Sequence, residues 1–187
     1  SLDGKKVIVQ GIGHVGEELV RLASEEGAKV IITDINEERL DEVSNKYGVD
    51  IYRGTDLYAE EADIYAPCAL GATVNDMTID RFRCSIIAGA ANNILLDPDK
   101  HGMELMKKNI LFAPDYVINA GGLINVANEI DGYDESKVKN KTEKIYDTLL
   151  NIYKISEDNG ISTSNASSRL AEQIIFEKRE EKLSKIE

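Results

Sequence analysis

The feature that most constrains the fold is a glycine-rich turn at residues 11–16, where Gly-Ile-Gly-His-Val-Gly fits the pattern G-x-G-x-x-G. The pattern alone is a weak signal, but its context is informative. It follows an apolar run at residues 7–9 that predicts a buried strand, and it opens residues 15–26, whose apolar positions recur with the period of a helix. A strand, a glycine turn and a helix in this order predict a unit that binds the pyrophosphate of a dinucleotide.

Each glycine of the turn has a separate physical task. Gly11 permits the tight turn, Gly13 lets the main chain approach a pyrophosphate, and Gly16 lets the helix pack close to the strand. The start of the helix then offers unpaired N–H groups and the positive end of its dipole to the phosphates. The predicted cofactor contacts in the turn are Gly11, Ile12, Gly13, His14, Val15 and Gly16. For His14, a solvated position at the start of the helix is the alternative.

An acidic residue follows the second predicted strand, at residues 29–33. Asp34 lies about 20 residues after the glycine turn, where a carboxylate accepts hydrogen bonds from the adenosine ribose. A carboxylate there repels the 2′-phosphate of NADP, and the next residues, Ile35, Asn36 and Glu37, supply no cation to bind it. The sequence therefore predicts NAD as the cofactor, with Asp34 and Ile35 beside its adenosine. The alternative is that Asp34 only caps the following helix.

Strands and helices alternate over the first two thirds of the chain. Further strands are predicted at residues 50–52, 63–66, 85–88 and 110–113, and helices at 37–47, 76–81 and 101–108. The strands are continuously apolar, as in a parallel sheet that is covered on both faces. Beyond residue 122 the strand signal ends. Two long amphipathic helices are predicted at 135–157 and 166–186, the second with Ser164 or Asn165 as its N-cap.

These patterns predict an α/β fold: a Rossmann-type, doubly wound, mostly parallel sheet with additional C-terminal helices. We expect one domain over residues 1–187, with the sheet-forming core in residues 1–122 and the additional helices in residues 123–187.

Charge and cysteine content narrow the class of protein. The chain has 34 acidic and 22 basic residues, a formal net charge of −12, which disfavours binding to nucleic acid and to anionic membranes. No apolar run approaches the ~18 residues that span a bilayer, and the first residues lack the pattern of a signal peptide. Cys68 and Cys84 have no metal-ligand spacing. We therefore expect no metal site, and free thiols in a reducing cytoplasm.

Four later segments carry a resemblance to a known family. They read Ala-Pro-Cys-Ala-Leu-Gly at 66–71, Ala-Gly-Ala-Ala-Asn-Asn at 88–93, Ala-Pro-Asp-Tyr-Val at 113–117 and Ile-Asn-Ala-Gly-Gly-Leu-Ile-Asn-Val at 118–126. In this order and spacing, the chain closely resembles the leucine, valine and phenylalanine dehydrogenases of the glutamate dehydrogenase superfamily. Three of the segments directly follow predicted strands, so we expect them to converge beyond the carboxyl ends of the strands, where open α/β sheets bind ligands.

The resemblance implies roles for residues in these segments. The implied cofactor contacts, all towards the nicotinamide end, are Cys68, Ala69, Leu70, Ala91, Asn92 and Asn119. Asn92 is also implied to face the substrate, and Leu123 and Val126 are implied to shape the substrate side-chain pocket. Medium aliphatic residues at these two positions favour a branched aliphatic amino acid such as leucine.

Structural alternatives exist for the same residues. Asparagines also stabilise turns locally, and Leu123 and Val126 also suit plain helix packing. Cys68 has no evident His or Asp partner, so we interpret it as a small buried residue rather than a nucleophile. The chain departs from the family at two positions: His14 stands where asparagine is usual, and Asn128 where aspartate is common.

The resemblance implies a leucine dehydrogenase-like activity: reversible oxidative deamination of an L-amino acid to a 2-oxo acid, with NAD as hydride acceptor. Family members use lysines of an N-terminal domain, in a Gly-Gly-Gly-Lys type region, to bind the substrate carboxylate and to act as general base. Here the only adjacent glycines are Gly121 and Gly122, with no lysine after them. We therefore expect an NAD-binding domain that lacks the N-terminal catalytic domain and does not catalyse by itself.

The expected partners follow from the same reasoning. They are NAD or NADH, the amino-acid substrate only in the presence of the missing domain, and identical subunits in the full-length protein. A non-enzymatic NAD-sensing or oligomerising module with this fold is the alternative, because fold does not dictate function. A Rossmann domain for another metabolite would have to account for all four segments.

Overall fold

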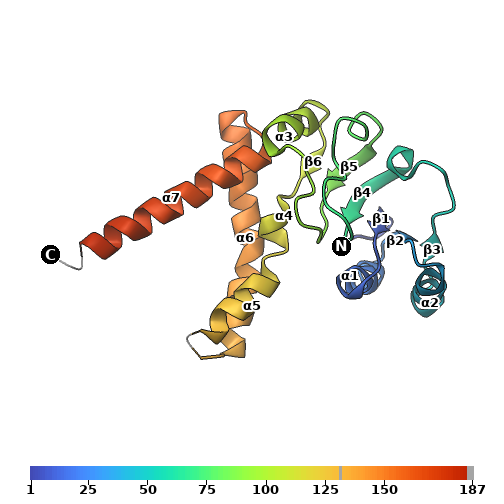
Figure 1. Ribbon diagram of the computed structural model, residues 1–187, viewed down its shortest axis with the longest axis horizontal. Helices are drawn as coiled ribbons and strands as arrows, with labels where there is room; N and C mark the ends of the chain where they lie inside the picture. Colours follow the sequence, from blue (N-terminus) through green and yellow to red (C-terminus); the bar gives the residue numbers. More distant parts are fainter. Residues whose placement is uncertain (131, 185–187) are drawn as a thin grey trace.

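The computed structural model describes residues 1–130 and 132–184 and contains a six-stranded parallel sheet (Figure 1). The strand order is β3-β2-β1-β4-β5-β6. The strands are β1 (Lys6–Gln10), β2 (Lys29–Thr33), β3 (Asp50–Ile51), β4 (Glu61–Pro67), β5 (Arg83–Ile87) and β6 (Leu111–Phe112). The chain builds outward from β1 to β3 and then returns to add β4 on the other side of β1. This reversal defines the doubly wound dinucleotide-binding topology, so the predicted fold class is confirmed.

The helices lie between the strands and after the last of them. They are α1 (His14–Glu25), α2 (Glu37–Tyr47), the 3₁₀ turn η1 (Leu57–Ala59), α3 (Pro98–Lys107), α4 (Asp115–Ile118), α5 (Gly121–Glu129), α6 (Glu135–Asn159) and α7 (Thr163–Leu183). In Figure 1, α4 to α7 stand beside the β6 edge of the sheet, and α7 projects away from it. Measured against the length and hydrophobicity of a bilayer-spanning segment, each helix in the described part of the chain falls short.

Each face of the sheet has its own hydrophobic core. Val7 and Val9 of β1 pack on one face with Val20 of α1, whereas Ile8 packs on the other face with Leu105 of α3. Successive side chains of a strand point to opposite faces, so a continuously apolar strand serves both cores. This burial fixes β1 in the middle of the sheet and places its glycine turn at the point where the strand order reverses.

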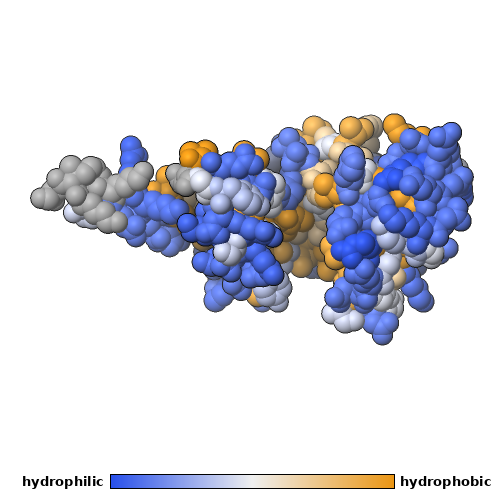
Figure 2. All heavy atoms as spheres, turned by 90° about the horizontal axis from the view of Figure 1, so that it is seen from below, coloured by the Kyte–Doolittle hydropathy of each residue, from blue (hydrophilic) through white to orange (hydrophobic). Residues whose placement is uncertain are grey.

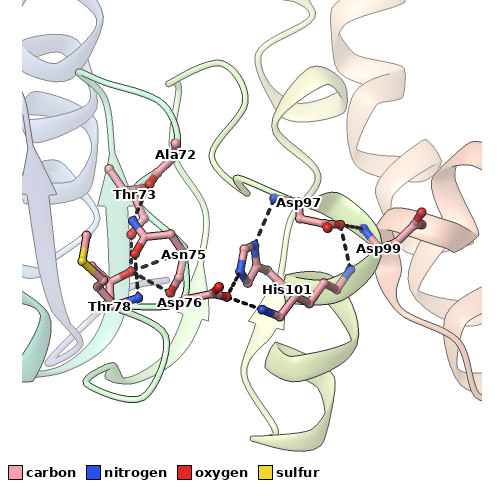
Figure 3. A network of polar contacts seen from close by, with 10 residues as sticks. Ala72, Thr73, Asn75, Asp76, Thr78, Asp97, Asp99 and His101 are labelled. Carbon is pink, nitrogen blue, oxygen red and sulfur yellow. Dashed lines mark hydrogen bonds and ion pairs between the residues drawn. The ribbon is translucent and has the colours of Figure 1, made fainter.

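The predicted helix at residues 76–81 is wrong, because these residues form turns. Asn75 Oδ1 accepts a hydrogen bond from Met77 N, and Thr78 Oγ1 donates to the carbonyl oxygen of Thr73 (Figure 3). Short polar side chains thus satisfy main-chain groups that a helix would have paired along its axis. The crossover between β4 and β5 is therefore a loop.

The predicted N-cap of the last helix is also wrong. Ser162, rather than Ser164 or Asn165, accepts the hydrogen bond from Asn165 N at 3.2 Å, and the helix begins at Thr163. Ser162 and Ser164 are both buried against Gly102 of α3, so burial does not distinguish them, and the hydrogen bond from Asn165 N identifies Ser162 as the cap. The predicted end of this helix at residue 186 lies outside the described residues.

Asn128 joins two of the C-terminal helices. Its side chain is buried on α5 and donates from Nδ2 to the carbonyl oxygen of Asp134, the N-cap of α6, at 3.1 Å. A carboxylate has no proton to donate when ionised. The asparagine at this position therefore supplies a link between α5 and α6 that an aspartate would not.

Candidate dinucleotide-binding site

The glycine turn between β1 and α1 is packed too closely for side chains at its ends. Gly11 has φ +94° and donates its N–H to the carbonyl oxygen of Thr33 at 2.8 Å. A Cβ on Gly11 would lie 2.5 Å from the Cβ of Ala69, and a Cβ on Gly16 would lie 1.9 Å from the carbonyl oxygen of Gly11. The two glycines therefore let β1, α1 and the loop after β4 meet.

Gly13 faces open space instead. A Cβ built on it meets no atom within 4 Å. Gly13 is the N-cap of α1, and no side chain caps this helix start. Its first-turn N–H groups thus stay available to a ligand, and a helix start with free N–H groups and no obstructing side chain suits a pyrophosphate.

The flanking residues of the turn differ in what they offer to a ligand. The Ile12 side chain is completely buried, so only its main chain can take part. Val15 is largely exposed beside the turn. His14 is exposed at the first position of α1.

Asp34 holds the turn from the neighbouring strand. Its Oδ2 accepts a hydrogen bond from Ile12 N at 2.8 Å, and its Oδ1 accepts one from Asn36 N at 3.0 Å. The alternative that Asp34 caps the next helix is wrong, because Asn36 is the N-cap of α2. Each carboxylate oxygen keeps acceptor capacity for a ribose hydroxyl. Ile35, next along the chain, is fully exposed.

A cation that the sequence pattern did not predict lies near this position. Arg39, in the first turn of α2, donates from Nε to the carbonyl oxygen of Ile12 at 3.5 Å. The guanidinium also pairs with Glu17 and Glu42. Its place one turn into α2 was the available signal, since a long side chain there can point back towards the N-terminal end of its helix and so towards the glycine turn.

Three loops converge at the other end of the site, as the strand positions predicted. Cys68 N donates to the carbonyl oxygen of Gln10 at 2.7 Å, and Ala91 N donates to that of Pro67 at 2.9 Å. The loop after β4 also joins the loop after β5 through Ala72 N and the carbonyl oxygen of Asn93, at 2.6 Å. The segments after β4 and β5 therefore form one hydrogen-bonded rim with the end of β1 at the carboxyl edge of the sheet, and Asp115 joins the segment after β6 to it through Asn93 N.

Asn92 and Asn119 bond to each other on this rim. Asn119 Nδ2 donates to Asn92 Oδ1 at 2.7 Å. The contact orients both amides, and within the described part of the chain Asn119 Oδ1 keeps its acceptor capacity and Asn92 Nδ2 its donor capacity for a ligand. A ligand bound here would meet one acceptor and one donor side by side.

Asp115 is a positioning residue that was not predicted from the sequence. Its carboxylate is 7 % exposed and accepts a hydrogen bond from Asn93 N at 2.7 Å. Asn93 has φ +53°, a left-handed conformation that asparagine tolerates better than most residues. Asp115 thereby fixes the turn that carries Asn92. Its location between Pro114 and Tyr116 in a segment of the resemblance was the only sequence signal.

The remaining predicted residues differ in how far they are buried. Leu70, Leu123 and Val126 are largely exposed, the last two one helical turn apart on α5, so the described residues do not bury them as helix packing would. Cys68 is half-buried, and burial raises the pKa of its thiol, the opposite of what an activated nucleophile needs.

A groove runs between α1 and the helices that follow the sheet. It is lined by apolar residues of α1, of the loop after β5 and of α4, among them Val15, Leu19, Ala88 and Ile118. Figure 2 shows hydrophobic surface in the hollow between α1 with α2 and the C-terminal helices. The groove thus borders the glycine turn at Val15 and the segments that carry Asn92 and Asn119 at Ala90 and Ile118.

Outside the rim, Asp76, His101 and Glu104 form a cluster that could be mistaken for a metal site. His101 is 1 % exposed, and its Nδ1 accepts a hydrogen bond from Asp97 N at 3.0 Å (Figure 3). The proton of the neutral ring must therefore sit on Nε2, which donates to Asp76 Oδ1 at 2.9 Å. No lone pair is left for a metal, and the contact links α3 to the loop after β4.

Comparison with known proteins places this site in a family. Residues 32–179 match the family model of glutamate/leucine/phenylalanine/valine dehydrogenases. The chain is 48 % identical to a leucine dehydrogenase of Thermoactinomyces intermedius over 175 residues, which cover 94 % of this chain and 48 % of that enzyme.

Solved structures agree. The crystal structure of L-tryptophan dehydrogenase from Nostoc punctiforme superimposes with a TM-score of 0.89 at 48 % identity, covering 92 % of this chain and 52 % of the other. A hetero-hexameric glutamate dehydrogenase from Thermus thermophilus shares the fold at 18 % identity, with a TM-score of 0.64 over 92 % of this chain and 47 % of the other. The chain spans about half the length of the curated relatives it matches. It belongs to the glutamate/leucine/phenylalanine/valine dehydrogenase family.

Proposed function

We propose that this chain binds NAD as the cofactor-binding part of an NAD-dependent amino-acid dehydrogenase. The observation that carries the proposal is the pairing of Asp34 Oδ2 with Ile12 N across an open glycine turn. This arrangement offers helix N–H groups to a pyrophosphate and a carboxylate to a ribose within one loop. The carboxylate disfavours a 2′-phosphate, which makes NAD the expected cofactor rather than NADP.

The residues of the rim would hold the nicotinamide end. Asn119 Oδ1 is free to accept from a ribose hydroxyl, and Asn92 Nδ2 is free to donate to a carboxamide or a substrate carboxylate. Bound NAD would supply the hydride acceptor for oxidation at the Cα of an L-amino acid. The residues of this chain would bind and orient the cofactor, and the proton transfers would fall to groups outside this chain.

For the substrate we propose a hydrophobic L-amino acid, with leucine or another branched aliphatic residue first. Leu123 and Val126 expose medium aliphatic side chains from α5, directly after Asn119. The relatives that are 48 % identical include a leucine dehydrogenase and an L-tryptophan dehydrogenase, so the substrates of such relatives differ in side-chain size. A pocket edge made of these two residues favours the smaller, branched side chain. We further propose a homo-oligomer in the cytoplasm for the full-length protein.

Titration of the chain with NADH and with NADPH tests the cofactor part by calorimetry. We expect saturable binding of NADH and at least about tenfold weaker binding of NADPH, since one lost favourable charged contact is worth about 1.5–3 kcal/mol. No heat of NADH binding at millimolar concentration would refute it. The chain alone should form no NADH from NAD and L-leucine, whereas the full-length protein should prefer leucine over phenylalanine and tryptophan.

A further inference from the structure

We propose that Glu17 is a second determinant of cofactor choice, because it holds Arg39 away from the position of a 2′-phosphate. The inference rests on the proposed NAD site and concerns its adenosine end. Asp34 alone explains repulsion of a 2′-phosphate. It does not explain why a guanidinium beside the same loop fails to attract one.

Arg39 and Asp34 hold the same short piece of chain. Asp34 Oδ2 accepts from Ile12 N at 2.8 Å, and Arg39 Nε donates to the carbonyl oxygen of Ile12 at 3.5 Å. The two side chains therefore bond to peptide groups on either side of one Cα. A ligand group that replaced the Asp34 carboxylate would lie within reach of the guanidinium, the side chain best suited to binding a phosphate in a bidentate manner.

The guanidinium of Arg39 is paired with two carboxylates, those of Glu17 and Glu42. Its Nη2 bonds to Glu17 Oε2, and its Nη1 bonds to Glu42 Oε2 at 2.6 Å. Glu17 lies on α1 and is only 16 % exposed, whereas Glu42 lies one turn along α2 and is 60 % exposed. An exposed ion pair contributes little and exchanges readily with solvent. Glu17 is therefore the carboxylate that fixes the position of Arg39.

Glu17 also binds the other donors on this side of the site. Its Oε1 accepts from Lys46 Nζ at 2.9 Å and from the Tyr47 hydroxyl at 3.2 Å. The hydrogen bond from Lys46 is the main reason why the pKa of Glu17 lies below its ordinary value, with smaller contributions from Tyr47 and Arg39. Glu17 thus stays ionised at neutral pH and holds two cations against α1.

Two carboxylates then act in different ways on a 2′-phosphate, which carries about two negative charges at neutral pH. Asp34 repels the phosphate directly. Glu17 keeps Arg39, the cation that could bind the phosphate, in an ion pair. Removal of the Asp34 charge alone leaves no partner for the phosphate. Removal of the Glu17 charge alone leaves Arg39 free to pair with Asp34. Only removal of both charges leaves Arg39 with no carboxylate partner but the exposed Glu42, so that its guanidinium is available to the phosphate.

The test is a cycle of variants titrated with NADPH and NADH: the unaltered chain, Asp34→Ser, Glu17→Gln and the double variant. We expect the double variant to bind NADPH about tenfold or more tightly than Asp34→Ser does, the size of one charge-assisted contact. The NADH affinity of these two should be similar. The gain should shrink in high salt. Glu42→Gln in the Asp34→Ser background is the matched control, since it frees the same guanidinium only from its exposed partner.

The outcomes separate this inference from the proposed function. Equal NADPH affinity with Glu17→Gln and with Glu42→Gln in the Asp34→Ser background would overturn the role of Glu17, while NADH binding by the unaltered chain would uphold the site itself. Failure of the unaltered chain to bind NADH would overturn both. Should Asp34→Ser unfold the loop, Asp34→Asn serves as the background, because its amide oxygen can still accept from Ile12 N.

Discussion

Replacement of Gly13 by alanine should separate cofactor binding from folding. The backbone of Gly13, at φ −61° and ψ −169°, is one that alanine adopts without strain, and the added Cβ meets no protein atom within 4 Å. Alanine is a poorer N-cap than glycine, but it loses less backbone entropy on folding, and each effect is worth roughly 0.5–1 kcal/mol. These opposing effects should leave the free energy of unfolding within about 1 kcal/mol of its original value.

The affinity of Gly13→Ala for NADH should fall, although its stability should change little. The methyl group would occupy the open space at the start of α1, where the pyrophosphate needs close approach to the main chain. Loss of one hydrogen bond to a charged group is worth about 1.5–3 kcal/mol, so NADH affinity should fall by about 10- to 150-fold. The assay is calorimetric titration with NADH, together with urea unfolding of the same preparation.

Gly16→Ala is the matched comparison. Its Cβ would lie 1.9 Å from the carbonyl oxygen of Gly11, so strand and helix would have to separate by about 1 Å to reach even a 3.0 Å contact. Overpacking of this kind costs about 1–3 kcal/mol or more, so this variant should be destabilised as well as weak in binding. If Gly13→Ala binds NADH as tightly as the unaltered chain, the placement of the pyrophosphate at this turn is refuted.

Three other residues give separate tests of the structure. Asn128→Asp should lower the free energy of unfolding by about 1–3 kcal/mol, because two acceptors would then face each other at the buried contact with Asp134; unchanged urea unfolding would contradict this link. His101→Ala should lower it by about 2–4 kcal/mol, since a buried ring with two hydrogen bonds is lost, and Asp76→Ala by about 1–3 kcal/mol, since it leaves the buried Nε2–H of His101 without its acceptor; unchanged thermal unfolding of either variant would argue against this assignment. Burial raises the pKa of Cys84 to about 11, so its thiolate is scarce below that pH, and labelling by a disulfide reagent at neutral pH should be slow until urea is added; rapid labelling of the native chain would disprove the burial.

Much of the fold follows from local patterns in the sequence. Continuous apolar runs predict buried strands, and the glycine turn after the first strand predicts the winding of the sheet, since both depend on neighbouring residues alone. The boundaries were less predictable where side chains compete with the helix for main-chain groups. The turns at residues 76–81, which Asn75 and Thr78 stabilise, and the cap at Ser162 are examples.

The candidate site, like the fold, has one part that the sequence predicts and one part that it does not. The glycines, Asp34 and the asparagines of the later segments are recognisable in the sequence, because turns and strand ends restrict which residue types fit. Their partners are not recognisable there. Asp115 meets the chain 22 residues away at Asn93 N, and Arg39 meets Glu17 across the same separation.

The sequence by itself thus determined the fold class and the family, and it predicts the residues of the proposed cofactor site. Only the tertiary structure decided which charges are free to act there. Arg39 could pair with a phosphate or with a carboxylate, and the packing of α2 against α1 brings it to Glu17. A charged side chain has many possible partners along a chain, and the relative placement of separate elements selects one of them.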